Sequence, residues 1–255
     1  NRAGAGGSTG APGVGQAAPA RYTPLQCNKN TLAVNPSLYP NLAYDPRTSF
    51  VPVALVARVP NVLVVHPAVA AKTAPELIAL AKAKPGSLRY ASGGNGSAAH
   101  IAMEYFKLRT GTNIEHIPYK GTAPAVADVM GGQVEVIMTG VPAVLQQVKS
   151  GKLRALAVSS TKPVASLPDL PTIASAYPDF EAVQWYGVVA PAKTPPAVIA
   201  LLNEEINRAL AAPALKARLD AEGAIATPLT AAAFGSMIEA EVARWKPVIE
   251  QAKMQ

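Results

Sequence analysis

The chain has 255 residues, of which 49% are hydrophobic and 15% are charged, and its net charge is +7. This composition suits one large domain or two small ones, and it excludes a disordered chain and a coiled coil. The Lys and Arg residues are scattered and aromatic residues are only 5%, so we expect attraction of small anions and no nucleic-acid partner. No apolar run is long enough to span a bilayer. No signal peptide is visible at Asn1, so we expect any such leader to be removed or absent.

Residues that could bind a metal are few. Cys27 is the single cysteine, which excludes an internal disulfide and a cysteine-cluster metal site. His66, His100 and His116 lie far apart in sequence, without an HExxH or paired spacing, so we expect packing or surface histidines. No P-loop or dinucleotide-binding fingerprint is found. We therefore expect no metal site and no cofactor.

In chain order, the apolar pattern predicts alternating strands and helices. Residues 1–16 are small and glycine-rich, and they are predicted to form a loop leading into a short helix. Thr73 is predicted to cap a helix that has Pro75 in its first turn. The predicted strands are 22–26, 51–57, 61–65, 88–91, 114–119, 134–138, 153–158 and 183–189. The predicted helices are 75–83, one around 101–108, two ending near 130 and 149, and 197–211, 213–222 and 231–251. This alternation implies a mostly parallel sheet with right-handed crossovers.

A glycine-rich turn between a strand and a helix, Tyr90–His100, is the first candidate ligand site. Its three glycines permit backbone angles closed to other residues, and Asn95 or Ser97 can cap the helix that follows. The first N–H groups of a helix have no internal partner, and the helix dipole favours negative charge there. The turn is therefore a candidate cradle for an anion, most simply a carboxylate. Turns of this kind usually bind nothing, so the ligand role depends on what lies beside it.

Three similar turns follow the next strands, at 120–124, 139–142 and 159–161. Parallel strands present their C-terminal ends at one edge of a sheet, so these four turns can converge on a ligand. A further polar group lies at another probable strand end and consists of Asn28, Asn30 and Thr31. Trp185 and Tyr186 face opposite sides of their predicted strand, so one of them can line a cleft if the pair is not simply packed in the core or at a hinge.

A series of ordered motifs covers nearly the whole chain. It includes Pro-Asn-Val-Leu-Val-Val-His-Pro at 60–67, Tyr-Ala-Ser-x-Gly-Asn-Gly-Ser at 90–97, Pro-Tyr-Lys-Gly-Thr-Ala-Pro-Ala at 118–125, Gly-Lys-Leu-Arg-Ala-Leu-Ala-Val at 151–158, Leu-Pro-Asp-Leu-Pro-Thr at 167–172 and Trp-Tyr-Gly at 185–187. With these motifs the chain resembles the Bug (TctC-type) proteins, the periplasmic solute receptors of tripartite tricarboxylate transporters.

The resemblance implies a two-domain α/β periplasmic binding protein of type II-like fold. Each domain would be a mostly parallel sheet flanked by helices, with the ligand in the cleft. We expect domain 1 at 1–68 plus 189–255 and domain 2 at 69–188. The implied ligand is a small organic carboxylate (a dicarboxylate, an aromatic acid or similar), and the implied partners are the membrane subunits of the transporter. The resemblance further implies a periplasmic monomer without catalytic activity.

Carried over to this sequence, the family's ligand contacts fall on strand-end turns and helix N-termini. The implied ligand-binding residues are Asn28, Asn30, Thr31, Ser92, Asn95, Gly96, Ser97, Gly121, Thr122, Ala123, Thr139 and Trp185. An acidic residue common after the strand at 134–138 is replaced here by Thr139-Gly140, which favours a ligand without an amine. Lys29 is expected to be exposed, although it could also pair with a carboxylate.

The family usually has another strand, a Pro-Gly-Gly loop, a helix and a second strand before the Asn-Arg-x-Gly-Ala-Gly-Gly motif that opens this sequence. We therefore expect either a cut chain or a first domain that lacks the family's first strand and helix. Two alternatives to a receptor remain open. One is a hydrolase that uses Ser97, His100 and Asp128, although no G-x-S-x-G elbow surrounds Ser97. The other is an effector-binding sensor domain of the same fold.

Overall fold

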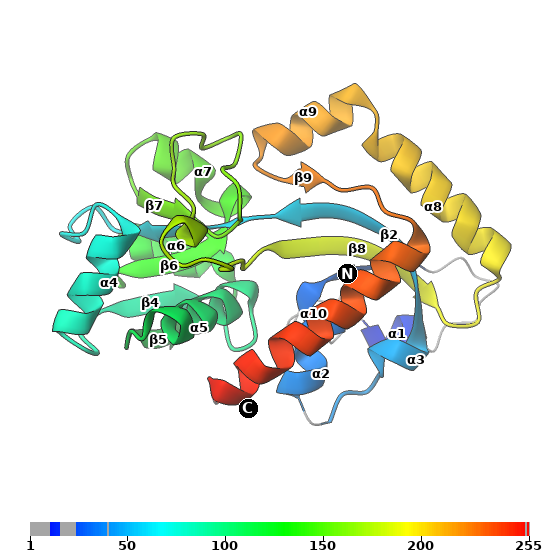
Figure 1. The fold of residues 1–255 in the computed structure, drawn as a ribbon, viewed down its shortest axis with the longest axis horizontal. Helices are drawn as coiled ribbons and strands as arrows, with labels where there is room; N and C mark the ends of the chain where they lie inside the picture. The colour runs from blue at the N-terminus through cyan, green and yellow to red at the C-terminus, as the bar shows by residue number, and fades with distance from the viewer. Residues whose placement is uncertain (1–10, 16–23, 40, 253, 255) are drawn as a thin grey trace. The chain divides into compact units, whose positions relative to one another are not determined.

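The computed structural model of the chain describes residues 11–15, 24–39, 41–252 and 254 (Figure 1). Predictions for residues 1–10, 16 and 22–23 lie outside these residues. The chain divides into two compact units. Unit 1 contains the described residues up to Arg58, together with Trp185–Leu219 and the chain from Ile225 onward. Unit 2 contains Val59–Gln184 and the short segment Asp220–Ala224.

Unit 2 is built on a five-stranded sheet with the order β5-β4-β6-β3-β7. The strands are β3 (Asn61–Val65), β4 (Arg89–Ser92), β5 (Glu115–Pro118), β6 (Val136–Gly140) and β7 (Arg154–Val158). β4 is parallel to β5 and β6, whereas β3 is antiparallel to both of its neighbours, β6 and β7. β7 therefore runs in the same direction as β6, and β3 alone opposes the other four strands. The expected boundary at residue 68 would place β3 in the first domain, but its strand partners belong to unit 2.

The chain path separates β3 from the other four strands of this sheet. β4, β5, β6 and β7 are joined in turn by single helices and run parallel, whereas β3 enters directly from β2 through Pro60 and runs against them. The helices of unit 2 are α4 (Ala74–Ala83), α5 (Ala98–Thr110), α6 (Thr122–Met130), α7 (Val141–Lys149) and the 3-10 turn Ile173–Ser175. Thr73 caps α4, as predicted, by accepting a hydrogen bond from the N–H of Glu76. Apolar side chains of α6 and α7, among them Val126 and Val144, pack with Val64 and Ile137 of the sheet.

Unit 1 has a four-stranded sheet with the order β1-β8-β2-β9. The strands are β1 (Leu25–Asn28), β8 (Gln184–Pro191), β2 (Phe50–Val59) and β9 (Ile225–Ala226). β1 pairs antiparallel with β8, and β2 pairs antiparallel with β9, so this sheet differs from the mostly parallel sheet that we expected. Its neighbouring strands come from distant parts of the chain, so no crossover helix imposes a parallel direction.

Seven helical segments surround that sheet in the described part of the chain. They are α1 (Ala11–Gly15), the π-helix η3 (Asn30–Val34), α2 (Asn35–Leu38), α3 (Pro46–Ser49), α8 (Pro196–Leu210), α9 (Pro213–Ala221) and α10 (Ala231–Gln251). The core of the unit joins Trp185 of β8 to Phe234 of α10, whose rings meet edge to face 5.5 Å apart. A Cβ atom at Gly187 would lie 2.3 Å from the Phe234 ring, so this close packing requires glycine on β8.

Most predicted elements are confirmed within a few residues. The short helical segments η3, α2, α3 and Ile173–Ser175, and the two-residue strand β9, have no counterpart in the prediction. β9 is too short to show an alternating pattern, and it forms because Ala226 and Ile225 pair with Ala57 and Arg58 of β2.

Candidate functional site

The turn between β4 and α5 has the shape that its glycines predict. Gly94 and Gly96 adopt positive φ angles of 110° and 72°. Ser97 caps α5, because its Oγ accepts a hydrogen bond from the N–H of His100 at 3.3 Å. The N–H groups of Gly94 and Ser97 are used inside the turn: they donate to Ser92 Oγ at 3.1 Å and to the Gly94 carbonyl at 3.1 Å. The turn is therefore held by its own hydrogen bonds.

The second predicted turn, between β5 and α6, packs directly against the first. The N–H of Tyr119 donates to the carbonyl of Ser92 at 3.0 Å. A Cβ atom at Gly93 would lie 3.3 Å from both the N and the Oγ1 of Thr122, and one at Gly94 would lie 3.0 Å from the Tyr119 carbonyl. Two glycines on the first turn thus let Thr122 and the backbone before it approach closely. The prediction that these turns converge is confirmed for this pair.

The sheet register explains why these turns meet. β4 and β5 align Ser92 with Pro118, and β4 and β6 align Ala91 with Ile137. The C-terminal ends of these strands therefore lie at one edge of the sheet, where open α/β sheets bind ligands. The same register brings Thr139 near the end of β6, where it is buried and pairs across from Val62 of β3. β7 shares this direction, so the 159–161 turn follows at the same edge.

The N-termini of the three helices after these strands are capped differently. α5 has a serine cap, whereas the N-cap residues of α6 and α7 are Gly121 and Gly140, which make no side-chain cap hydrogen bond. Gly121 has a φ of 116°, which other residues rarely adopt. A helix N-terminus without a side-chain acceptor leaves its first N–H groups for an outside acceptor, and its dipole favours an anion. Thr122 and Ala123, in the first turn of α6, are exposed.

Three aromatic rings stack beneath the first turn. His116 lies between Tyr90 and His100, with ring centroids 4.7 Å and 4.1 Å away and near-parallel planes. Ser92 Oγ lies 2.6 Å from His116 Nε2, and the N–H of Gly96 donates to His100 Nδ1 at 3.0 Å. Burial, with the neighbouring His116, lowers the pKa of His100 to about 4, and burial also lowers the pKa of His116. The expectation of packing histidines holds for His100 and His116, but the pair also forms hydrogen bonds to the turn.

Next to this stack, Glu104 of α5 accepts hydrogen bonds from two side chains. The Tyr90 hydroxyl donates to Glu104 Oε1 at 2.5 Å, and Lys107 Nζ donates to the same oxygen at 2.7 Å. Burial, the Glu104 charge and this hydrogen bond raise the pKa of Tyr90. The sequence analysis missed this network, although Glu104 and Lys107 stand three apart on one helix, a spacing that pairs opposite charges.

The predicted site residues of unit 1 are arranged differently from those of unit 2. Asn28 Oδ1 accepts from both the N–H and the hydroxyl of Thr31, at 3.1 and 3.2 Å, so it caps the helical segment that follows. Asn30 and Thr31 are buried, and the Thr31 carbonyl accepts from the Tyr44 hydroxyl at 2.7 Å. Trp185 is buried in the core, where its Nε1 donates to Glu241 Oε2 at 3.2 Å.

Lys29 departs from its expected exposure. Its side chain is 1% exposed, and its Nζ lies 4.1 Å from the centre of the Trp245 ring. Trp245 Nε1 donates to the same Glu241 oxygen that Trp185 contacts. The cation is buried because an aromatic face can compensate part of its lost hydration. The sequence holds no local sign of this contact, since Lys29 and Trp245 are separated by most of the chain.

The hydrolase alternative requires Ser97, His100 and Asp128 to form one hydrogen-bonded chain. In a catalytic triad the serine hydroxyl meets a ring nitrogen of the histidine, and Nδ1–H donates to the carboxylate. Here Ser97 Oγ accepts a hydrogen bond from the backbone N–H of His100, and His100 Nδ1 accepts one from the N–H of Gly96. Asp128 instead accepts from the Tyr119 hydroxyl at 2.7 Å. The three residues are therefore not arranged as a triad.

The described residues show no metal site, no reactive thiol and no membrane-spanning helix. No group of three or more His, Cys, Asp or Glu side chains there is arranged to hold a metal ion. Cys27 is buried, its thiol donates to the Gly187 carbonyl at 3.3 Å, and burial raises its pKa to about 12. No helix of the described segments combines the length and apolar character that crossing a bilayer demands.

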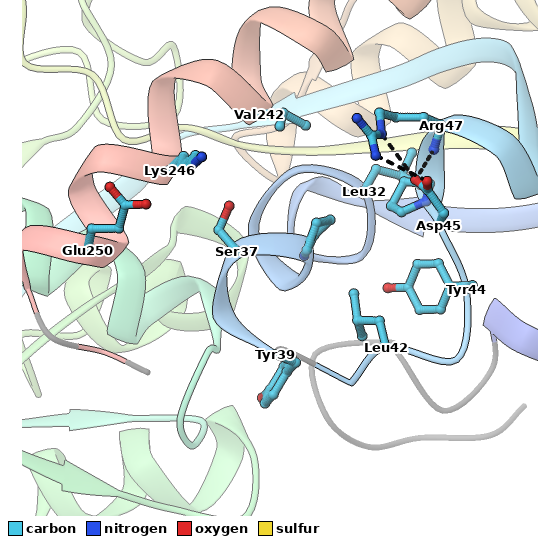
Figure 2. Close-up of a pocket in the computed structure, with 12 residues that line it drawn as sticks. Leu32, Ser37, Tyr39, Leu42, Tyr44, Asp45, Arg47, Val242, Lys246 and Glu250 are labelled. Atoms are coloured by element: carbon cyan, nitrogen blue, oxygen red, sulfur yellow. Dashed lines mark hydrogen bonds and ion pairs between the residues drawn. The ribbon is translucent and has the colours of Figure 1, made fainter.

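Figure 2 shows a pocket of about 670 Å³ in unit 1. Leu32 and Tyr44 line it, Lys246 and Glu250 of α10 border it, and the ion pair between Arg47 and Asp45 spans 3.2 Å there. None of the predicted ligand-binding residues is among those that line it. The pocket lies beside the helical segment that follows Asn28. Because none of its lining residues is a predicted ligand-binding residue, the candidate site is assigned to the turns of unit 2.

The chain was compared with known proteins. The family model described as "Tripartite tricarboxylate transporter family receptor" (TctC) matches residues 1–254. Protein BugT of Bordetella pertussis (strain Tohama I) is 42% identical over 256 residues, which cover 98% of this chain and 78% of BugT. The solved structure of R. palustris Rpa4515 with adipate has a TM-score of 0.93 and 34% identity, over 99% of this chain and 85% of that chain. The structure of the periplasmic binding protein BugD has a TM-score of 0.89 and 34% identity, over 100% of this chain and 86% of that chain. The two-domain α/β fold expected from the motifs is thereby confirmed, and the chain belongs to the TctC family of tripartite tricarboxylate transporter receptors.

Proposed function

We propose that this protein is a periplasmic receptor that captures a small organic carboxylate and delivers it to the membrane subunits of a tripartite tricarboxylate transporter. One observation carries the proposal: the 92–97 and 119–123 turns of unit 2 pack together, so that the turn leading into α5 lies against the first residue of α6. A structure similar to this chain holds adipate, a dicarboxylate. The family match and the likeness to BugD support the transport role and the periplasmic location.

The donors in these turns suit a carboxylate. Ser97 Oγ accepts from the His100 N–H, and a hydroxyl can also donate, so its own proton is left for a ligand oxygen. In the first turn of α6, Thr122 offers a hydroxyl and a backbone N–H, and Ala123 offers a backbone N–H. Burying a carboxylate is tolerable only when its oxygens accept several such hydrogen bonds.

The residues fall into two roles in this proposal. Asn95, Ser97, Thr122 and Ala123 contact the ligand directly, with Gly96 and Gly121 allowing its close approach. Ser92 and Thr139 are buried and support the turns from within the sheet. In unit 1, Asn28, Asn30, Thr31 and Trp185 remain residues that the family resemblance implies; Thr31 bonds to Asn28, and Trp185 is packed in the core of that unit.

Thermal shift and calorimetric titration of the purified protein test the proposal. The panel contains adipate, shorter dicarboxylates, monocarboxylates, aromatic acids and amino acids. A ligand present at 100 times its Kd stabilises the folded state by about 2.7 kcal/mol, which raises the unfolding midpoint measurably. Ser97→Ala should weaken binding, whereas Ser150→Ala, at the exposed C-terminal end of α7, should leave it unchanged. A cooperative melt that no member of the panel moves would refute the proposed function.

A further inference from the structure

The stacked histidines make contacts that simple packing does not require. His100 comes from α5 and His116 from β5, yet each forms a hydrogen bond to the β4–α5 turn. His100 is 7% exposed and the rings lie 4.1 Å apart at an angle of 11°. The turn that carries the proposed ligand contacts therefore rests on two side chains that can gain a proton.

The hydrogen bonds define the state of His100. Its Nδ1 accepts a hydrogen bond from the Gly96 N–H, so this nitrogen carries no proton of its own and the ring is neutral, with its proton on Nε2. Ser92 Oγ accepts the N–H of Gly94, donates to its carbonyl and meets His116 Nε2. The two histidines thus fix Gly96 and Ser92, one at each end of the turn.

We propose that His100 and His116 are positioning residues of the carboxylate cradle: as a neutral, stacked pair they hold the 92–97 turn in its binding conformation, and proton uptake by the pair releases the turn and weakens ligand binding. The inference rests on the proposed function of the same turn. Neither ring touches the ligand in this proposal. Each acts through Ser92 or Gly96.

Protonation would break the arrangement in two ways. A proton on His100 Nδ1 would point at the N–H of Gly96, so an attraction would become a contact between two donors. Two imidazolium rings in direct contact would also repel each other. The charged and titratable groups that face the pair are Glu104 and Lys107 of α5 and Tyr90 of β4. Glu104 favours the protonated rings, but burial and Lys107 oppose it and lower the pKa of both histidines.

A simple electrostatic role predicts the opposite sign. If the histidines only supplied charge, their protonation would place positive charge near the anion and strengthen binding. If they position the turn, acidification weakens binding. The direction of the pH effect therefore separates the two roles.

The experiment uses the full chain and adipate as the probe. Calorimetry measures the adipate affinity of the wild type, His100→Asn and His100→Phe at pH 7.5 and at steps down through about pH 4, where His100 takes up its proton. Asparagine offers an amide oxygen close to the position of Nδ1 and does not titrate, whereas phenylalanine keeps a stacking ring and removes the acceptor. We expect His100→Asn to retain wild-type affinity at pH 7.5, and His100→Phe to lose about tenfold.

The pH profile supplies the second readout. The adipate affinity of the wild type should fall more steeply with acidification than that of His100→Asn. Adipate itself titrates equally in both experiments, so the difference between the two profiles reports the histidine alone. Equal affinities of His100→Phe and wild type, or a wild-type affinity that rises as the pH falls, would overturn the positioning role.

A ligand-free measurement keeps this inference separate from the proposed function. In the nuclear magnetic resonance spectrum of the wild type, the amide signal of Gly96 should move with the same pH midpoint as the His100 ring. If no carboxylate binds but the two signals move together, the proposed function fails and the positioning of the turn stands. If the Gly96 amide signal does not shift as His100 titrates, the positioning inference fails whether or not adipate binds.

Discussion

Two regions of this receptor carry similar polar residues at the end of a strand, yet they use the polar groups of these residues differently. The 92–97 turn of unit 2 and the 28–31 segment of unit 1 both follow a strand and both carry Asn with Ser or Thr. In unit 2, glycines bring a second turn close, and the adjoining helix α6 starts from a glycine without a side-chain cap. In unit 1, Asn28 Oδ1 accepts hydrogen bonds from the N–H and the hydroxyl of Thr31, so these polar groups are used within the segment itself.

The comparison shows that polar residues at a strand end are an ambiguous signal. A side chain there can serve a ligand or close the end of its own helix, and the two uses compete for the same donors and acceptors. Glycine at the N-cap removes the internal acceptor and leaves the helix N–H groups for an external one. The turns of unit 2 are therefore the stronger candidate for anion binding.

The largest expected effect comes from removing a glycine that lets the two turns approach. Gly94→Val places a branched side chain at a φ of 110° and its Cβ 3.0 Å from the Tyr119 carbonyl. We expect a loss of about 1–3 kcal/mol in the free energy of unfolding and loss of measurable adipate binding, because the turn must move. Denaturant unfolding and calorimetry measure the two effects.

Gly131→Ala is the matched control for that substitution. Gly131 has a negative φ, and its added Cβ would meet its nearest atom at 3.5 Å, an ordinary contact. This variant should bind adipate like the wild type. Normal binding by Gly94→Val would contradict the view that the two turns must pack closely.

A smaller pair of effects separates affinity from stability. Thr122→Val removes a hydroxyl that we place on the ligand, so adipate affinity should fall about tenfold with little change in stability. Thr31→Val removes the hydroxyl that donates to Asn28 Oδ1 at 3.2 Å, so stability should fall by about 1 kcal/mol with a smaller change in affinity. Calorimetry and urea unfolding of both variants provide the four values.

Thr122→Ser and Thr31→Ser retain the hydroxyl groups and serve as controls. If Thr31→Val were to lose more affinity than Thr122→Val, the contrast between the two regions would be reversed. Thr31 would then belong to the ligand contacts, as the family resemblance first implied.

Much of this contrast could be read from the sequence, and some could not. The order of strands and helices follows from apolar patterning, and the Ser97 cap and the glycine turns follow from residues that are neighbours in the chain. The reversed direction of β3 depends on which distant strands accept its hydrogen bonds. The contact of Lys29 with Trp245, and that of His100 with His116, likewise join residues far apart in sequence, and local patterns carry no information on such pairs.

The smallest expected effect concerns Cys27, which directly precedes the 28–31 segment. Its thiol donates to Gly187 of β8, and burial raises its pKa to about 12, so almost no reactive thiolate exists near neutral pH. We expect a thiol reagent at pH 8 to label the folded protein far more slowly than the protein in denaturant, with the same slow rate when adipate is added. This outcome would fit a rigid segment that supports unit 1. Rapid labelling that adipate suppresses would instead show that the segment opens and responds to the ligand, which would make it an equal partner of the turns in unit 2.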